Sequence, residues 1–390
     1  MPASYPPVLG GLQTVAHNLA KQLLMRGHKL RVVTNRYPVN LPARETIEGV
    51  TVNRLLFLKP QFDHLRRHRF DLFAGSLYFG PSSSRQFGRI LRQFRPEVVN
   101  VHFPAYQIEA ILKLRQQLDF RLVVSLHGHD VQQFVNGEGL KNGPQADALS
   151  RLSRLLKSAD AVTAVSEDLL RKAMKLEPDI RGQAQVIPNG IDPDRFANAA
   201  AYQHSRPYVL ALGRLVRKKG FDLLIDAYAQ RRSEHNLDLV IAGTGEELHA
   251  LKQQVESLGL TGAVHFFGLA LPDEVVKLMN GSSGIVVPSR EEPFGIVALE
   301  ALAAGKRLVA TETGGMKELL NDLAINGGEA SAATNRRIFL VKPSVEGIAA
   351  GLHELFKAIE NGCSLNDFSI PDKYIWAQVA QHYEQILLAR

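Results

Sequence analysis

The sequence has one cysteine, Cys363, and no apolar run near the roughly 20 residues that a membrane-spanning helix needs. A lone cysteine forms no internal disulfide and no cysteine-based zinc site, which fits a reducing compartment. The opening residues, MPASYPPVLGG, lack the basic and apolar regions of a secretory signal. These absences predict a soluble protein of the cytoplasm.

The length of 390 residues exceeds what one ordinary hydrophobic core fills, and it suits two α/β domains of about 150 to 200 residues each. Short β-rich runs alternate with amphipathic helical stretches over nearly the whole chain. This rhythm is typical of parallel sheets covered by helices on both faces. We therefore expect an α/β protein of two Rossmann-like domains with a cleft between them.

The expected strands are 30–34, 50–56, 98–102, 121–126, 161–165 and 185–187 in the first half, and 208–214, 238–245, 264–268, 284–289 and 307–312 in the second. Residues 197–207 are polar, rich in alanine and without periodicity, which predicts a linker. We expect domains at 1–200 and 201–373. An amphipathic helix at 374–390 should pack back on the first domain.

The charge is uneven, with a net +10 over residues 1–200 and −3 over residues 201–390. Arginines recur in the basic half at Arg66, Arg67, Arg69, Arg85, Arg89, Arg92 and Arg95. They form either a solvated helix face or a surface for phosphates or an anionic membrane. Nucleic-acid binding is disfavoured, because no aromatic-interleaved basic motif or helix-turn-helix pattern accompanies the charge.

The most informative segment is EEPFGIVALE, residues 291–300, which follows an expected strand and leads into a helix. Gly295 before that helix leaves backbone N–H groups free to meet a diphosphate. Glu292 lies ahead of the helix and could face a sugar hydroxyl. Glu300 lies inside it and could accept hydrogen bonds from a ribose, the alternative being a plain surface-helix carboxylate.

A second segment, GRLVRKKG, places Arg214 and Lys219 after the strand that begins the second half. Cations there can neutralise two phosphates and stabilise a departing nucleoside diphosphate. The alternative is a solvated basic turn. Two glycine pairs are weaker signals: Gly10 and Gly11 precede a helix, and Gly243 and Gly245 follow a strand, so either pair could approach a phosphate or simply form a loop.

The histidines His127 and His129 follow an apolar strand and would share one face if that strand continued. Such a pair can ligate a metal, serve structure, or contact a sugar and its acceptor. The remaining histidines do not complete a cluster, and Asp130 alone is a poor third ligand. We therefore expect no metal, and a contact of His127 with substrate.

Together these segments resemble the retaining family-4 glycosyltransferases of GT-B fold, over almost the entire chain. The resemblance rests on PPxxGG, RGHKLRVVT, the HG after a strand, IPNGID, GRLxxxKG, IAGTGEE and PSxEEPFGIVALEALAAGKRLVAT followed by Gly314-Gly315. The specific part is the pair of glutamates eight residues apart around PFG. It implies a hexosyltransferase that needs neither metal nor cofactor.

The resemblance also implies residue roles. Arg214 and Lys219 would hold the diphosphate, helped by backbone amides around Phe294, Gly295 and Ile296. Glu300 would bind the ribose and Glu292 the sugar hydroxyls. His127 would contact the sugar near its reacting carbon, and Gly10-Gly11 the phosphate side of the donor.

The implied donor is a UDP- or GDP-sugar, and the acceptor is a sugar, a glycan or a lipid-linked molecule. The basic first half of the chain is the basis for expecting peripheral contact with an anionic membrane. The acceptor attacks from the face of the leaving group, so that configuration is retained without a protein nucleophile. That agrees with the lack of paired carboxylates suited to a double displacement.

The sequence departs from the family at two places. The apolar strand that usually precedes PPxxGG is missing, and residues 326–337 lengthen a loop. Alternatives remain: a nucleotide-sugar 2-epimerase of the same fold, or an inactive nucleotide-sugar-binding protein. An NAD-dependent dehydrogenase is disfavoured, because no G-x-G-x-x-G follows the first strand.

Overall fold

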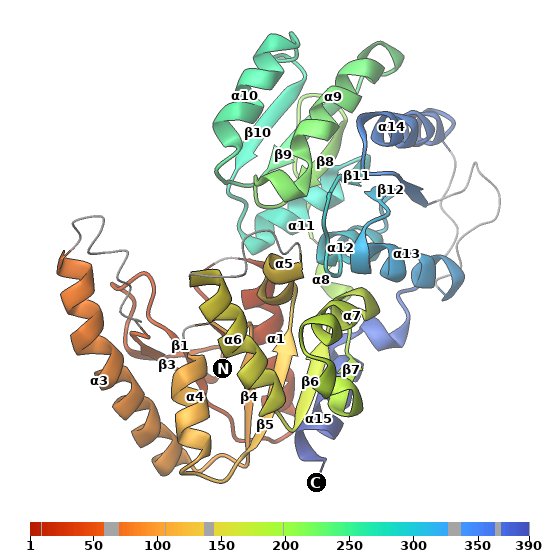
Figure 1. Cartoon of the computed structure of the whole chain (residues 1–390). Helices are drawn as coiled ribbons and strands as arrows, with labels where there is room; N and C mark the ends of the chain where they lie inside the picture. Colours follow the sequence, from red (N-terminus) through yellow and green to blue (C-terminus); the bar gives the residue numbers. More distant parts are fainter. Residues whose placement is uncertain are drawn as a thin grey trace. The chain divides into compact units, whose positions relative to one another are not determined.

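The computed structural model describes residues 1–8, 10–57, 70–105, 107–135, 144–197, 199–326, 337–362 and 368–389, with side chains omitted for 70–81 and 144–145. Arg66, Arg67, Arg69, Cys363 and most of the lengthened loop lie outside these ranges. The chain divides into two compact units, Met1–Pro188 with Trp376–Arg390, and Asn189–Ile375. Both are α/β, as predicted (Figure 1).

The boundary lies at Pro188, and not at residue 200 as predicted. The reason is that the expected linker packs on the second unit. The backbone N–H of Tyr202 donates to the carbonyl of Lys277 at 2.9 Å, and the Asn280 amide donates to Phe196 and Ala199, each at 2.9 Å. Hydrogen bonds to the second unit thus hold this polar, aperiodic stretch, and its amino-acid composition does not predict them.

The first unit holds two sheets. One has the order β1-β3-β2, with β1 (Val32–Asn35) parallel and β2 (Arg44–Ile47) antiparallel to β3 (Val50–Leu55). The other is fully parallel in the order β4-β5-β6-β7, formed by Val98–His102, Arg121–Leu126, Ala161–Ala164 and Ala184–Val186. The central strands β5 and β6 are apolar and buried because helices cover both faces. Among the described strands of this unit, β2, which is short and half exposed, is the one that the sequence did not predict.

The helices of the first unit are α1 (Gly11–Met25), α3 (Phe70–Phe94), α4 (Ile108–Arg115), α5 (His129–Val135), α6 (Pro144–Lys157), α7 (Glu167–Leu176) and α15 (Trp376–Leu388). The last helix, α15, packs on α1 and β4. Glu384 joins it to α1, accepting from the Nε of Arg26 at 2.8 Å. The α15 side chains Trp376, Val379 and Tyr383 are buried.

The second unit has one six-stranded parallel sheet in the order β10-β9-β8-β11-β12-β13 (Figure 1). Its strands are β8 (Tyr208–Leu212), β9 (Asp238–Ala242), β10 (Val264–Gly268), β11 (Gly284–Val287), β12 (Leu308–Thr311) and β13 (Ile338–Val341). The chain builds outward from β8 in one direction and then returns to β11 beside it. This reversal is the topological switch point at which open α/β sheets bind ligands.

The helices of the second unit are α8 (Asp194–Ala197), α9 (Phe221–Arg231), α10 (Leu248–Ser257), α11 (Pro272–Gly281), α12 (Ile296–Ala303), α13 (Gly314–Asn326) and α14 (Val345–Glu360). On one face, α9, α10 and α14 form a core with alternate strand residues such as Val209 and Ile241. The loops that lead into α9 and α12 begin at the carboxyl ends of β8 and β11.

Candidate active site

Two loops meet at the switch point of the second unit. One, residues 213–220, follows β8, and the other, residues 288–295, follows β11. Lys219 from the first loop and Glu292 from the second form an ion pair, with Nζ and Oε2 2.5 Å apart although the residues are 73 positions apart in the chain. Both side chains are partly buried. The structure therefore brings together two of the residues singled out in the sequence.

Backbone contacts and a second ion pair fix these loops. The N–H of Arg290 donates to the carbonyl of Lys218 at 2.8 Å. The Arg290 guanidinium binds both carboxylate oxygens of Asp222, at 2.6 and 2.7 Å, and so ties the loop after β11 to the start of α9. This bidentate ion pair holds the Arg290 guanidinium in one orientation.

Gly220 is required by the close approach of the two loops. Its φ of 68° is left-handed, and a Cβ there would lie 2.1 Å from the carbonyl oxygen of Pro288. Gly243 and Gly245, which follow β9, lie equally close to the backbone of the loop after β8. A Cβ on Gly243 would lie 1.9 Å from the Gly213 carbonyl oxygen, and a Cβ on Gly245 would lie 2.2 Å from the Leu215 carbonyl oxygen. These contacts supply a packing reason for both glycines; their approach to a donor stays a prediction.

The site carries an excess of positive charge. Arg214 is exposed, and Lys218 and Lys219 are partly buried in the same loop. Burial, followed by the charges of Arg214 and Lys219, lowers the pKa of the Lys218 ammonium. Three cations held this close would gain from a bound anion, because it would offset their mutual repulsion. Lys218 was not singled out from the sequence, where it reads as one more residue of a basic turn.

The helix α12 begins beside this charge. Its N-cap residue is Gly295, with φ 101°, so no side chain covers the first N–H groups of the helix. Phe294 is buried and Ile296 is half-buried, with Met316 packed 3.1 Å from where a Gly295 Cβ would lie. Gly315, in the first turn of α13, donates to the carbonyl of Glu292 at 3.1 Å. The free N–H groups and the helix dipole suit an anion.

Glu300 lies on α12 one turn beyond these amides and is half-buried. Burial raises the pKa of its carboxyl to about 7, against the opposing charge of Arg195. A carboxyl group with so high a pKa is held at an energetic cost that a hydrogen-bond donor, such as a ribose hydroxyl, would relieve. This environment differs from that of a plain surface-helix carboxylate.

His127 lies in the first unit, directly after β5. Its Nε2 is 3.0 Å from Nδ1 of His102, which ends β4, and the two rings stack at 5.2 Å. Burial lowers the pKa of His127 to about 4, so the ring is neutral at pH 7. The sequence did not single out His102 as a neighbour of His127, because adjacent parallel strands bring their ends together whatever their separation in sequence.

His127 and His129 do not share a strand face. The strand β5 stops at Leu126, and His129 begins α5. The Asp130 carboxylate closes this turn by accepting from the backbone N–H groups of His127 and Gly128, at 3.0 and 2.7 Å. Asp130 therefore serves the backbone of the turn, which explains why the strand cannot continue.

Gly10 and Gly11 begin the 15-residue helix α1, with Gly10 at the N-cap position and φ 155°. Both are exposed, and the first turn of the helix contains no acidic residue. Their amides are therefore available to an anion. Their predicted contact with a donor is not tested by the first unit alone.

Within the described residues, one group of three side chains has the spacing of a metal site: His204, Asp238 and His265. The Nε2 atoms of the two histidines are 3.0 and 3.1 Å from one Asp238 oxygen, and Arg206 binds the other oxygen at 2.8 Å. The group lies at the amino ends of β9 and β10. Lys219 and Glu292 follow the carboxyl ends of strands, so this group is separate from the candidate active site.

Comparisons with known proteins agree with this architecture. The family model "Glycosyltransferase Family 4" matches residues 9–195, and "Glycosyl transferases group 1" matches residues 194–359. A glycogen synthase of Mycobacterium tuberculosis is 30% identical over 407 residues, covering 99% of this chain and 92% of that protein.

Two solved structures share the fold. Sucrose-phosphate synthase from Thermosynechococcus elongatus has a TM-score of 0.73 at 20% identity, covering 98% of this chain and 94% of that one. HepE of Anabaena, solved with UDP and glucose, has a TM-score of 0.69 at 18% identity, covering 100% and 99%. The fold is that of the GT-B enzymes, as predicted. The chain belongs to the family-4 glycosyltransferases and is a transferase.

Proposed function

We propose that this glycosyltransferase binds the diphosphate of a nucleotide sugar at the switch point of the second unit. The observation that carries the proposal is the Lys219–Glu292 ion pair, which lies where three cations gather beside the open N-terminus of α12. Lys219 and Arg214 bind phosphate oxygens, and the first amides of α12 add hydrogen bonds. Glu300 accepts from the ribose, and Glu292 from the sugar hydroxyls.

The reaction proposed is a retaining transfer without a metal ion. As the bond between the sugar and the diphosphate breaks, negative charge grows on the leaving nucleoside diphosphate. Arg214 and Lys219 stabilise that charge, as a divalent cation does in other transferases, and Lys218 adds to the positive field. The acceptor attacks from the same face and gives its proton to the departing phosphate. His127, neutral at pH 7, contacts the sugar near its reacting carbon.

For the donor we propose a UDP- or GDP-linked hexose. HepE, of the same fold, was solved with UDP and glucose, which supports a UDP donor in this fold. The acceptor is proposed to be a sugar, a glycan or a lipid-linked molecule, and the protein to act in the cytoplasm. Binding measurements with UDP and GDP, each tested separately, identify the base of the donor.

The proposal is tested by thermal shift and calorimetry with UDP, GDP and their sugars in EDTA. One nucleotide should stabilise the wild type. Lys219→Ala should weaken binding about 10- to 100-fold, since a hydrogen bond between charged groups contributes about 1.5–3 kcal/mol. The matched control is Lys357→Ala, an exposed lysine on α14. Equal binding by Lys219→Ala and the control would contradict the proposed phosphate contact.

Product analysis separates the enzyme classes. With the identified donor, a transferase releases nucleoside diphosphate in proportion to glycosylated acceptor, and NMR of the product reports whether the anomeric configuration is retained. A 2-epimerase changes the donor sugar without an acceptor. An inactive binding protein does neither, although it is stabilised by the nucleotide.

A membrane-bound acceptor is supported by the arginines of α3. Arg85, Arg89 and Arg92 are exposed on this helix, while Phe87 and Leu91 between them are buried. Among the helices that the structure describes, none combines the length and apolar character needed to cross a bilayer. Binding to vesicles containing anionic lipid, lost on neutralising Arg85, Arg89 and Arg92, is the expected result; binding that is absent or unchanged would contradict it.

A further inference from the structure

Two histidines and a buried aspartate meet at the amino ends of β9 and β10, outside the candidate active site. Asp238 begins β9, and its side chain is 1% exposed. His265 is the second residue of β10, and His204 lies in the segment 199–207, which leads into β8. The Nε2 atoms of the two histidines lie 3.0 and 3.1 Å from the same Asp238 oxygen, Oδ2. Side chains from three parts of the chain thus converge on one point.

The register of the sheet explains why two of these side chains share a face. In the parallel pairing of β9 with β10, His265 lies opposite Val240, which is two residues beyond Asp238. Because side chains alternate along a strand, Asp238, Val240 and His265 point to the same face of the sheet. Leu239 and Val264 point the other way, into the core formed with α9, α10 and α14. The sheet backbone therefore places Asp238 and His265 side by side.

His204 is held by hydrogen bonds on both sides of its position in the chain. Ahead of it, the backbone N–H of Tyr202 donates to the carbonyl of Lys277 at 2.9 Å. Beyond it, the carbonyl of Pro207 accepts from the backbone N–H of Asp238 at 2.9 Å. The His204 side chain is 14% exposed. An imidazole fixed in this way needs little further ordering to bind a ligand.

The three side chains have the spacing that a tetrahedral cation requires. Zinc binds imidazole nitrogen and carboxylate oxygen at about 2.0–2.2 Å, which places neighbouring ligand atoms about 3.3 Å apart. The two nitrogen–oxygen distances are close to this value, and the three ligand atoms all lie within 4.8 Å of one another. The His265 side chain is 38% exposed. The group is therefore open to solvent on one side, where an ion could enter and a water could serve as fourth ligand.

Arg206 fixes the carboxylate of Asp238 from the opposite side. Its Nη2 is 2.8 Å from Oδ1 and also donates to the carbonyl of Gly262, and its Nε is 3.2 Å from Oδ2. An outer partner of this kind orients a carboxylate that binds a metal. Its positive charge disfavours Mg²⁺ and Ca²⁺, which depend on several oxygen ligands, whereas two imidazoles suit Zn²⁺.

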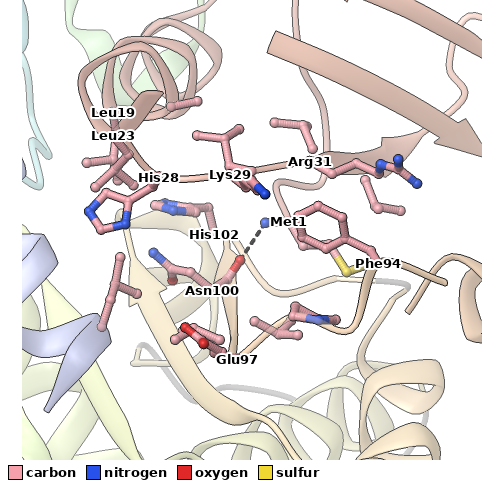
Figure 2. Close-up of a pocket in the computed structure, with 18 of the residues that line it drawn as sticks. Met1, Leu19, Leu23, His28, Lys29, Arg31, Phe94, Glu97, Asn100 and His102 are labelled. Carbon is pink, nitrogen blue, oxygen red and sulfur yellow. Dashed lines mark hydrogen bonds between the residues drawn. The ribbon is translucent and has the colours of Figure 1, made fainter. Parts of the chain in front are cut away.

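Two histidines of the first unit form pairs and not groups of three. His28 and His102 both line a cavity of about 230 Å³ beside α1 and β4 (Figure 2). The Nε2 of His28 is 2.5 Å from Glu384, and the Nδ1 of His102 is 3.0 Å from His127. Within the part of the chain that the structure describes, the spacing of a metal site is thus confined to the group in the second unit.

We propose that His204, Asp238 and His265 form a structural site for one divalent cation of the zinc type. The two Nε2 atoms and Oδ2 of Asp238 are the protein ligands, and water completes the tetrahedron. The bound ion joins the segment before β8 to the starts of β9 and β10, and so stabilises the second unit. The proposal is independent of the sugar transfer proposed above, which uses no metal.

The test uses the full chain without a histidine tag, freed of metal with EDTA that is then removed. Calorimetric titration with Zn²⁺ should show one site per chain, which Mg²⁺ and Ca²⁺ do not fill. His265→Ala should weaken this binding at least about 100-fold, since even an outer partner of a metal ligand changes affinity by about 10- to 100-fold. The matched control is His249→Ala, an exposed histidine on α10, which should bind as the wild type does.

Two further measurements report where the ion binds. Co²⁺ should give the strong visible absorption of a four-coordinate ion in the wild type and in His249→Ala, but not in His265→Ala. Zn²⁺ should slow amide exchange at Tyr202 at least about tenfold in the same two proteins alone. His204→Ala should repeat the loss from another part of the chain. No binding to the wild type, or equal binding by His265→Ala and the control, would overturn the proposal.

Discussion

At the scale of single residues, burial sets the charge state of two side chains that the sequence singled out, one in each unit. Glu300 and His127 both have pKa values shifted toward the neutral form, to about 7 and about 4. A carboxyl that protonates near pH 7 and an imidazole that remains neutral there are suited to binding hydroxyl groups. Their shifts have opposite consequences for the pH dependence of stability.

Glu300→Gln should stabilise the protein at pH 8 and leave it nearly unchanged at pH 4. The folded-state pKa of Glu300 exceeds the usual 4.5, so the folded state binds more protons between pH 4.5 and 7, and stability falls across that window as pH rises. Glutamine removes this penalty, by about 1–3 kcal/mol above pH 7. Urea unfolding at both pH values measures it, and an equal effect at pH 4 and pH 8 would contradict the burial of an ionising Glu300.

The same Glu300→Gln variant should bind the nucleotide more weakly, because a carboxylate is a better hydrogen-bond acceptor for ribose hydroxyls than an amide. The affinity is measured by calorimetry with a nucleotide sugar between pH 4 and pH 8. Because the diphosphate of a nucleotide sugar keeps its charge over this range, a change in affinity reports the protein group and not the ligand. Gained stability together with lost affinity is the signature of a binding residue. Unchanged affinity would remove Glu300 from the ribose site.

His127→Ala should lower the turnover number at least about tenfold while the affinity for the free nucleoside diphosphate stays unchanged. The reason is that the proposed contact is with the transferring sugar, which the nucleoside diphosphate lacks. His249→Ala, an exposed histidine on α10, is the matched control. Because His127 is neutral above about pH 4, activity should show no loss attributable to it between pH 8 and pH 6. Wild-type turnover in His127→Ala would contradict the assigned contact.

At the scale of elements, the candidate active site of the second unit depends on how closely the loops after β8, β9 and β11 approach one another. Glycines at 220, 243 and 245 let backbone meet backbone there. The ion pairs Lys219–Glu292 and Arg290–Asp222 then hold the loops in register. Loops held in this way would keep the cations in place for the proposed anion, which would reduce the free-energy cost of ordering them on binding.

Gly220→Ala should destabilise the second unit by about 1–3 kcal/mol more than Gly259→Ala does. The two glycines have nearly equal φ, 68° and 67°, so the backbone strain of alanine is matched. A Cβ at Gly259 would meet nothing within 4 Å, whereas one at Gly220 would meet Pro288. Chemical unfolding gives the difference, and equal destabilisation would show that φ alone matters at Gly220.

At the scale of the whole molecule, the two units have separate cores, and we expect them to respond separately to ligand. The proposed donor residues Lys219 and Glu300 belong to the second unit, while Trp376 belongs to the first. A nucleoside diphosphate at 100 times its dissociation constant stabilises the unit that binds it by about 2.7 kcal/mol. It should therefore raise a calorimetric transition that Trp376 fluorescence does not report. An equal shift of the fluorescence midpoint would show that the units unfold as one.

The sequence by itself determined the alternation of strands and helices, and hence the α/β class, because hydrophobic periodicity and glycine act over a few neighbouring residues. It also identified Arg214, Lys219, Glu292 and Glu300 as chemically suited to a nucleotide sugar. Strand ends were less well predicted: 238–245 was expected as strand, whereas β9 stops at Ala242 and the two glycines beyond it form loop contacts.

Only the tertiary structure decided which distant residues meet. The order of strands places β8 beside β11, and so puts Lys219 against Glu292. The pairing of β4 with β5 gives His127 the neighbour His102 rather than His129. Local preference fixes what each segment becomes, whereas the packing of segments against one another fixes which side chains share a site.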